Sequence, residues 1–166
     1  KKIDIIKLFL SIVNKYSEAY NFCWYHPETG FWLGASPESF INLNGNNIKT
    51  ISLAGTKPKD ENIKIKWDKK NYEEQEIVTS YLKNTLEPHL TSYTVKGPKT
   101  IQAGNLLHLQ TTLTGKLKSN SNVLSNLISI LHPTPAVCGF PKQLAMDFIK
   151  KHELIDRKYY SGFLGM

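Results

Sequence analysis

The sequence predicts an α+β fold, in which a run of antiparallel strands is followed by alternating helices and strands. Between residues 20 and 54, aromatic and aliphatic runs flank two turn sequences, PETG at 27–30 and NGNN at 44–47. Turns of this kind between β-favouring runs are typical of hairpins, so we expect about four antiparallel strands there. Apolar residues with helical spacing occur before and after this region. No repeat or linker interrupts the pattern, so we expect one continuous domain over residues 1–166.

The remaining elements follow from hydrophobic periodicity and from capping residues. Pro88 ends the second expected helix, Ser121 caps the third, and Pro141 suits the first turn of the last. In chain order we expect a helix at 3–16, a polar mobile connection at 57–71, a helix at 73–86, strands at 91–95 and 106–117, helices at 121–131 and 142–153, and a strand-like segment at 159–165.

Charge and cysteine content narrow the class of protein. The net charge is 21 − 14 = +7, but the lysines are scattered along the chain and Arg157 is the only arginine. This distribution favours a solvated surface over a nucleic-acid interface, which would cluster its basic residues. Cys23 and Cys138 are far apart and form no CxxC motif, which indicates reduced thiols in the cytoplasm. No run of about 18 apolar residues exists, so we expect no membrane span.

Two corners between strands could present side chains to a ligand. Glu38 follows Gly34 and Pro37 in the sequence GASPE, where a fixed turn would hold the carboxylate in a cleft. Gly55 and Thr56 lie at a strand end, where open backbone N–H groups and a hydroxyl would suit a carboxylate. For both corners, an ordinary turn at the surface or at a strand end is the simpler explanation of the residue types.

Two further residues are candidates because of the faces they occupy. Glu74 lies three and four residues before Ile77 and Val78, which puts a carboxylate on the apolar face of a helix. A buried carboxylate needs a partner, and a divalent cation is one possibility, whereas a stabilised first helical turn is the simpler explanation. On the expected strand at 106–117, His108 shares a polar stripe with Gln110. This stripe could line a cavity, but a structural histidine is the simpler explanation.

Six motifs occur in the same order as in a known family. They are GASPES, LAGT, EEQEIV, LLHLQTTLTG, LHPTPAVCGFPKQLA and DRKYYSGFLG, and they extend over nearly the whole chain. In this order they resemble the chorismate-binding enzymes, which include isochorismate, salicylate, anthranilate and aminodeoxychorismate synthases. The stretch LHPTPAVCGFPKQLA resembles the isochorismate synthase branch in particular. The resemblance implies a fold of two antiparallel sheets packed face to face with helices outside.

The resemblance also implies roles for individual residues. Glu38 matches the general acid that protonates the departing 4-hydroxyl of chorismate, and His108 matches an active-site histidine. The Gly55-Thr56 pair and Ala136 match positions that contact the substrate. Glu74 matches a carboxylate that binds Mg²⁺, although Gln75 stands where the family usually has histidine. The implied reaction is isochorismate formation from chorismate, for the menaquinone or a siderophore pathway.

The resemblance places several parts of the family's site outside these 166 residues. They are the general-base lysine, an arginine that binds the substrate carboxylate, and a second Mg²⁺ ligand. We therefore expect the chain to be the central portion of a chorismate-binding domain and to be inactive by itself. A salicylate or anthranilate synthase and a degenerate, non-catalytic chorismate-binding module are the alternatives. We expect no nucleic-acid or membrane partner, and the oligomeric state is left open.

Overall fold

The computed structural model describes residues 3–36, 38–60, 65–118 and 123–165. Contacts divide the chain into two compact units, residues 1–39 and 40–166, and each unit is described by itself. Both contain an antiparallel sheet, and helices accompany each sheet, so the predicted α+β class is confirmed. The face-to-face packing of the sheets and the single domain stay predictions. None of the helices in the described ranges is long and apolar enough to span a bilayer.

Unit 1 consists of one helix and one hairpin, namely α1 (Ile5–Lys15), β1 (Tyr20–His26) and β2 (Gly30–Ser36). The helix begins where it does because the Asp4 side chain accepts a hydrogen bond from the Lys7 N–H at 3.0 Å. Trp24 and Trp32 are partners in the strand register, and their rings stack with centroids 6.1 Å apart. This cross-strand pair holds the register of the predicted first hairpin.

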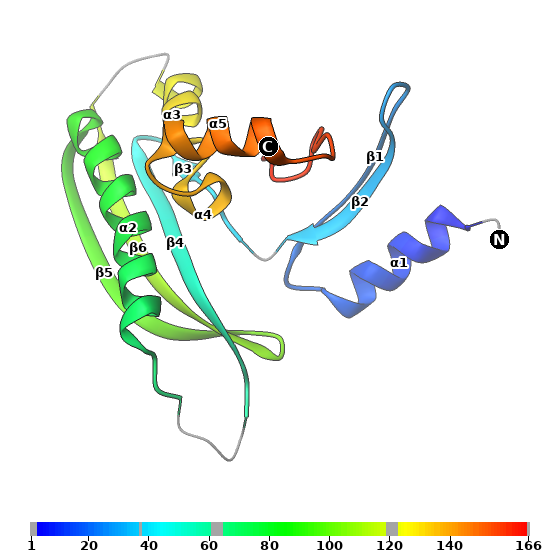
Figure 1. The fold of residues 1–166 in the computed structure, drawn as a ribbon, viewed down its shortest axis with the longest axis horizontal. Helices are drawn as coiled ribbons and strands as arrows, with labels where there is room; N and C mark the ends of the chain where they lie inside the picture. The colour runs from blue at the N-terminus through cyan, green and yellow to red at the C-terminus, as the bar shows by residue number, and fades with distance from the viewer. Residues whose placement is uncertain (1–2, 37, 61–64, 119–122, 166) are drawn as a thin grey trace. The chain divides into compact units, whose positions relative to one another are not determined.

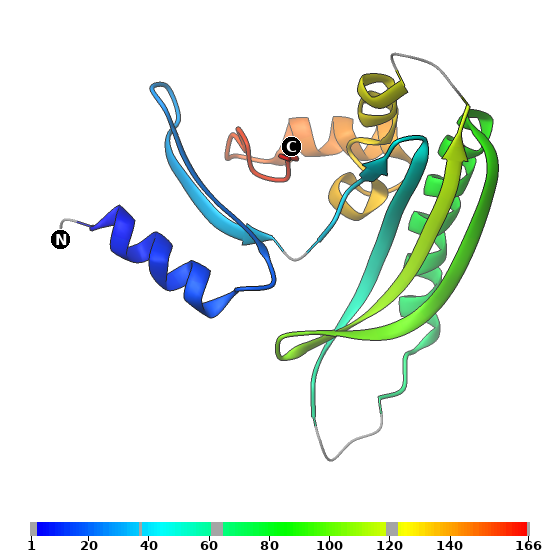
Figure 2. The same ribbon diagram turned by 180° about the vertical axis from the view of Figure 1, so that it is seen from behind.

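Unit 2 is a four-stranded sheet with helices along one face (Figures 1 and 2). Its strand order is β3-β4-β6-β5, and all neighbours are antiparallel. The elements are β3 (Asn42–Asn44), β4 (Asn47–Pro58), α2 (Lys69–Leu86), the 3₁₀ turn η1 (Glu87–His89), β5 (Leu90–Ala103), β6 (Leu106–Leu117), α3 (Val123–Leu131), α4 (Pro135–Cys138) and α5 (Lys142–His152).

Most of the expected elements are present, but several boundaries and the strand expected at 159–165 were wrong. Strand β5 continues to Ala103, well past the expected end at residue 95, because a register shift between Lys96 and Lys99 lets Gly97-Pro98 interrupt the pairing without ending the strand. The residues expected to form a strand at 159–165 form turns and irregular backbone instead. Ser121, the expected cap of α3, lies outside the described residues.

Helix α2 packs along one face of the sheet (Figure 1). In the view from behind, the sheet lies in front of the helix (Figure 2). Apolar side chains of α2, α3 and the strands form the core between the two layers. The buried members are Ile48, Val78, Leu82, Leu86, Leu90, Leu113, Leu117, Leu127 and Leu131. Along β6 the odd-numbered residues Leu109, Thr111 and Leu113 face this core, so His108 and Gln110 belong to the other face, as predicted.

The polar residue that α2 buries is Gln75, whereas the sequence interpretation placed Glu74 on the apolar face. Gln75 is 2 % exposed, and Val78 and Leu82 follow it on the buried side of the helix. Its amide nitrogen donates to the Ser52 carbonyl at 3.2 Å, to the Ser52 hydroxyl at 2.8 Å and to the Thr111 hydroxyl at 2.9 Å. The amide nitrogen can donate to these neutral acceptors, whereas a carboxylate cannot donate to any of them. Gln75 Oε1, in contrast, is buried without a hydrogen-bond partner among the described residues.

We expect Gln75→Leu to lower the free energy of unfolding by about 1–3 kcal/mol, because it leaves the buried Thr111 hydroxyl without this donor. The measurement is denaturant-induced unfolding of the purified protein. Gln143→Leu is the matched control, since Gln143 is exposed on α5 and donates only to Asp147 on the same helix. Equal stabilities of the two variants would contradict a structural role for the Gln75 network.

Candidate functional site

The predicted Gly55-Thr56 corner is a β-bulge near the end of β4. Ala54 pairs with Leu109 and Thr56 with His108, so Gly55 is the extra residue at the register shift. Its φ of +69° lies in the left-handed region that favours glycine. The bulge changes which face the following residue occupies. Thr56 therefore lies opposite His108 on the face of the sheet away from α2.

The bulge brings two predicted site residues into direct contact. The Thr56 Oγ1 atom lies 3.1 Å from His108 Nδ1, and the Gly55 carbonyl oxygen lies 3.2 Å from the same nitrogen. His108 is half-buried and Thr56 is exposed. His108 is 52 residues after Thr56 and 53 after Gly55 in the chain, and the three residues form one polar corner.

A pocket of about 400 Å³ borders this corner on the α2 side and contains three of the predicted site residues. Gly55 comes from β4, Glu74 from α2, and Ala136 from α4. Small and apolar groups make up most of the remaining lining: Leu53, Ala54, Ile77, Val78, Pro135, Gly139 and Phe140. A carboxylate at the edge of a mostly apolar pocket is a common arrangement for binding a small polar ligand.

Glu74 has only one charged partner among the interactions described. Its carboxylate lies 3.6 Å from Lys70 Nζ, one turn earlier on α2, and its side chain is 47 % exposed. Within residues 3–36, 38–60, 65–118 and 123–165, no three His, Cys, Asp or Glu side chains gather closely enough to hold a metal ion. Glu74 fits Mg²⁺ as one ligand, since this ion is often bound through one or two carboxylates together with water and substrate oxygens.

The 132–141 loop, which carries Ala136, is held by a lysine that the sequence interpretation missed. Lys142 Nζ donates to the His132 carbonyl at 3.1 Å, to the Ile130 carbonyl at 3.3 Å and to the Tyr81 hydroxyl at 3.1 Å. Burial, and then the Lys142 charge, lower the pKa of His132. Burial raises the pKa of the Cys138 thiol.

Trp67 and Asn71 are a second omission of the sequence interpretation. They pack over Gly55, because a Cβ atom added there would lie 3.1 Å from the Trp67 ring and 3.3 Å from Asn71 Cβ. Trp67 is fixed in turn by a 2.9 Å hydrogen bond from its Nε1 to Thr100. The expected mobile connection at 57–71 is therefore anchored at its end. The available signal was that Trp67 is the only aromatic residue in that lysine-rich stretch.

Glu38 belongs to unit 1, where it follows β2 and is exposed. Because each unit is described by itself, the expectation that Glu38 shares a cavity with His108 stays a prediction.

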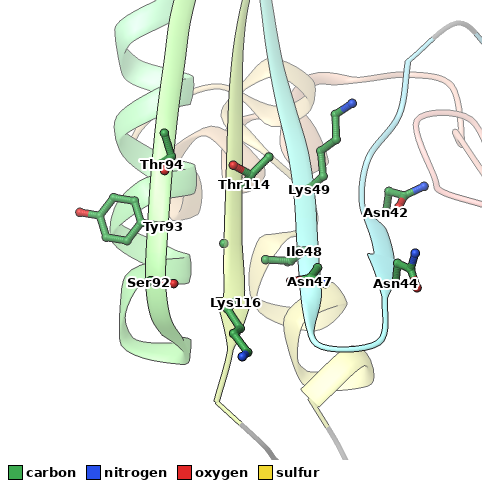
Figure 3. A pocket seen from close by; sticks show the side chains of 11 residues that line it. Asn42, Asn44, Asn47, Ile48, Lys49, Ser92, Tyr93, Thr94, Thr114 and Lys116 are labelled. Atoms are coloured by element: carbon green, nitrogen blue, oxygen red, sulfur yellow. The ribbon is translucent and has the colours of Figure 1, made fainter.

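A second concave surface lies at the other end of the sheet and contains none of the predicted site residues (Figure 3). Two rows of polar side chains cross the strands there. Lys49, Thr114 and Thr94 are successive partners in the register, and Asn47 pairs with Lys116 in the next row. The side chains in these rows include no acidic group and no buried polar atom without a hydrogen-bond partner. We therefore interpret this surface as a solvated face of the sheet.

Comparison with known proteins identifies the family of the chain. The family profile for "Chorismate binding enzyme" matches residues 1–166. The isochorismate synthase EntC of Escherichia coli K12 is 33 % identical over 98 % of this chain and 44 % of its own length. The isochorismate synthase DhbC of Bacillus subtilis is 30 % identical over 80 % of this chain and 36 % of its own. The chain thus spans less than half the length of these relatives.

Solved structures show the same fold. DhbC from Bacillus anthracis superposes with a TM-score of 0.83 at 30 % identity, over 94 % of this chain and 45 % of that one. Anthranilate synthase component I from Streptococcus pneumoniae has a TM-score of 0.78 at 20 % identity, over 92 % of this chain and 35 % of that one, which supports the fold alone. With a family profile that covers every residue, the chain belongs to the chorismate-binding enzyme family.

Proposed function

We propose that the protein is an isochorismate synthase, which converts chorismate to isochorismate. The observation that carries this proposal is the pocket that three family-matched residues of unit 2 line together. These residues are Gly55, Glu74 and Ala136, whereas Thr56 and His108 form a polar corner across the Gly55 bulge, on the face of the sheet away from α2. Relatives named as isochorismate synthases support this branch of the family over the others.

The proposed reaction exchanges one hydroxyl for another without net oxidation. A general base, which the family resemblance places outside these 166 residues, takes a proton from a water molecule as its oxygen forms a bond to C2. The ring double bonds shift, and the C4–O bond breaks as the departing oxygen takes up a proton and leaves as water. Glu38 supplies this proton as general acid. Thr56 and the bulge at Gly55 bind a carboxylate of the substrate, and Ala136 sets the width of the pocket against the ring.

We also propose that Glu74 binds Mg²⁺. The ion would neutralise a substrate carboxylate that otherwise faces the Glu74 carboxylate across an apolar pocket. Support comes from the position of Glu74, the one acidic side chain among the residues that line this pocket.

The test of the proposed function is product analysis. The full-length protein is incubated with chorismate and Mg²⁺, and the products are separated by liquid chromatography. Isochorismate as the main product is expected. Salicylate, or anthranilate when ammonia is supplied, would assign the protein to another branch, and unchanged chorismate together with retained binding would indicate a non-catalytic module.

We expect Glu74→Gln to raise the Mg²⁺ concentration required for half-maximal activity by at least about tenfold, since loss of even an outer-shell partner of a metal ligand costs about 10–100-fold in affinity. Glu73→Gln is the matched control. Glu73 is the preceding residue, pairs with Lys69 at 3.3 Å and does not line the pocket. An unchanged Mg²⁺ requirement in Glu74→Gln would remove Glu74 from the metal site.

A further inference from the structure

The contacts of His108 determine which of its ring nitrogens carries the proton. Nδ1 has two neighbours, the Gly55 carbonyl oxygen at 3.2 Å and the Thr56 hydroxyl at 3.1 Å. A carbonyl oxygen is an acceptor only, so a lone pair on Nδ1 would face a lone pair on Gly55. A proton on Nδ1 turns this repulsion into a hydrogen bond. In the neutral ring Nε2 is then unprotonated.

The backbone that imposes this tautomer is itself held in place. Gly55 points its carbonyl at His108 because the bulge gives it a φ of +69°. From the opposite side of the strand, Trp67 and Asn71 occupy the space that a side chain at residue 55 would need. The Gly55 carbonyl lies 3.2 Å from Nδ1 and serves as its acceptor. The Thr56 hydroxyl can then accept from Nδ1–H as well, and its own hydrogen is available to a ligand.

We propose that the Gly55 carbonyl fixes His108 in the Nδ1–H tautomer, so that this corner offers a ligand one acceptor, His108 Nε2, and one donor, the Thr56 hydroxyl. A carboxylate has only acceptors and so suits Thr56, whereas a hydroxyl or a water molecule suits His108. For the substrate proposed above, on which this part rests, a hydroxyl or the attacking water lies against His108 and a carboxylate lies against Thr56. His108 is thus a hydrogen-bond acceptor for the ligand in its neutral form.

The tautomer is measured directly by long-range ¹H–¹⁵N correlation spectra of the full-length protein with labelled histidine, above the pH at which the ring is protonated. The His108 signals are identified by their loss in His108→Asn, and His152→Gln, on the exposed end of α5, is the control for indirect changes. A protonated Nδ1 and an unprotonated Nε2 are expected. A protonated Nε2 in the neutral ring would overturn the proposal, whatever the enzyme catalyses.

Two pairs of variants test the consequence for the ligand. His108→Gln places an amide oxygen near the position of Nε2, whereas His108→Asn reaches only the position of Nδ1. We therefore expect His108→Gln to retain about tenfold more kcat/KM than His108→Asn, the worth of one hydrogen bond. Equal losses in both would refute the acceptor role. If no chorismate turns over but the spectra show Nδ1–H, the proposed function fails and the tautomer assignment stands.

The second pair separates Thr56 from Gly55. Thr56→Val removes the hydroxyl but leaves the Gly55 carbonyl, so the Nδ1–H tautomer should persist while KM rises. Thr56→Ser should restore KM. A change of tautomer in Thr56→Val would show that the hydroxyl, and not the carbonyl, controls the ring, and would overturn the proposal.

Discussion

Replacing Glu38 by glutamine in the full-length protein is expected to lower kcat by about 10²–10⁴-fold, the usual contribution of a general acid. Glutamine has the shape of the protonated acid but gives up no proton, so the C4 hydroxyl would leave as a poor leaving group. The fold should be retained, because Glu38 is exposed. The measurement is steady-state turnover of chorismate, together with circular dichroism of the variant.

Glu28→Gln is the control for Glu38→Gln. Glu28 is also an exposed glutamate of unit 1, in the turn between β1 and β2, and no role is assigned to it. Its variant should turn over chorismate at the rate of the unmodified protein. A loss of less than tenfold in Glu38→Gln would exclude Glu38 as the acid and would point to a group elsewhere in the protein.

Gly55→Ala is expected to have the second large effect, because two costs add at this position. A side chain at a φ of +69° is strained by about 1–2 kcal/mol. The new Cβ would also approach the Trp67 ring to 3.1 Å, and forcing such neighbours apart costs about 1–3 kcal/mol more. Because the Gly55 carbonyl orients His108, we expect turnover to fall by about 10²-fold, as displacements near 1 Å can cause.

Gly45→Ala separates the two costs. Gly45 has a φ of +56° in the turn between β3 and β4, and a Cβ added there would meet nothing within 4 Å. Its variant should show the strain alone, in denaturant-induced unfolding, with unchanged turnover. If both variants lose the same stability and keep their activity, Trp67 does not constrain the bulge and the His108 geometry does not depend on it.

The sequence was most informative where a local pattern determines the structure. Alternation along residues 106–117 predicted which face of β6 His108 would occupy, because side chains of a strand point to opposite sides in turn. The hairpin turns at 27–30 and 44–47 were also predicted from a local pattern, because the backbone conformations of such turns favour particular residues. These features need no knowledge of distant parts of the chain.

Features that depend on distant contacts were not predicted. The bulge at Gly55 is visible only once β4 is paired with β6, although Gly at a strand end hinted at it. Helical spacing suggested Glu74 for the buried side of α2, but the choice of Gln75 depends on the Ser52 and Thr111 hydroxyls that face it. In α2, hydrogen bonds to the neighbouring strands, and not the spacing of apolar residues along the helix, determine which polar residue is buried.

Lys142 has a consequence for the timescale on which the pocket opens. Its ammonium group joins the end of α3, the start of α5 and Tyr81 of α2 through three hydrogen bonds. Charge-assisted bonds of this kind are among the stronger ones in proteins, so they hold both ends of the loop that carries Ala136. The Cys138 and Gly139 amides donate to the Thr134 and Pro135 carbonyls of the same loop, and we expect their deuterium exchange to be slow if the neighbouring helices hold the loop closed. Ligand entry past Ala136 would then be governed by the cooperative opening of three helices, and slow deuterium uptake by this loop would report its rate.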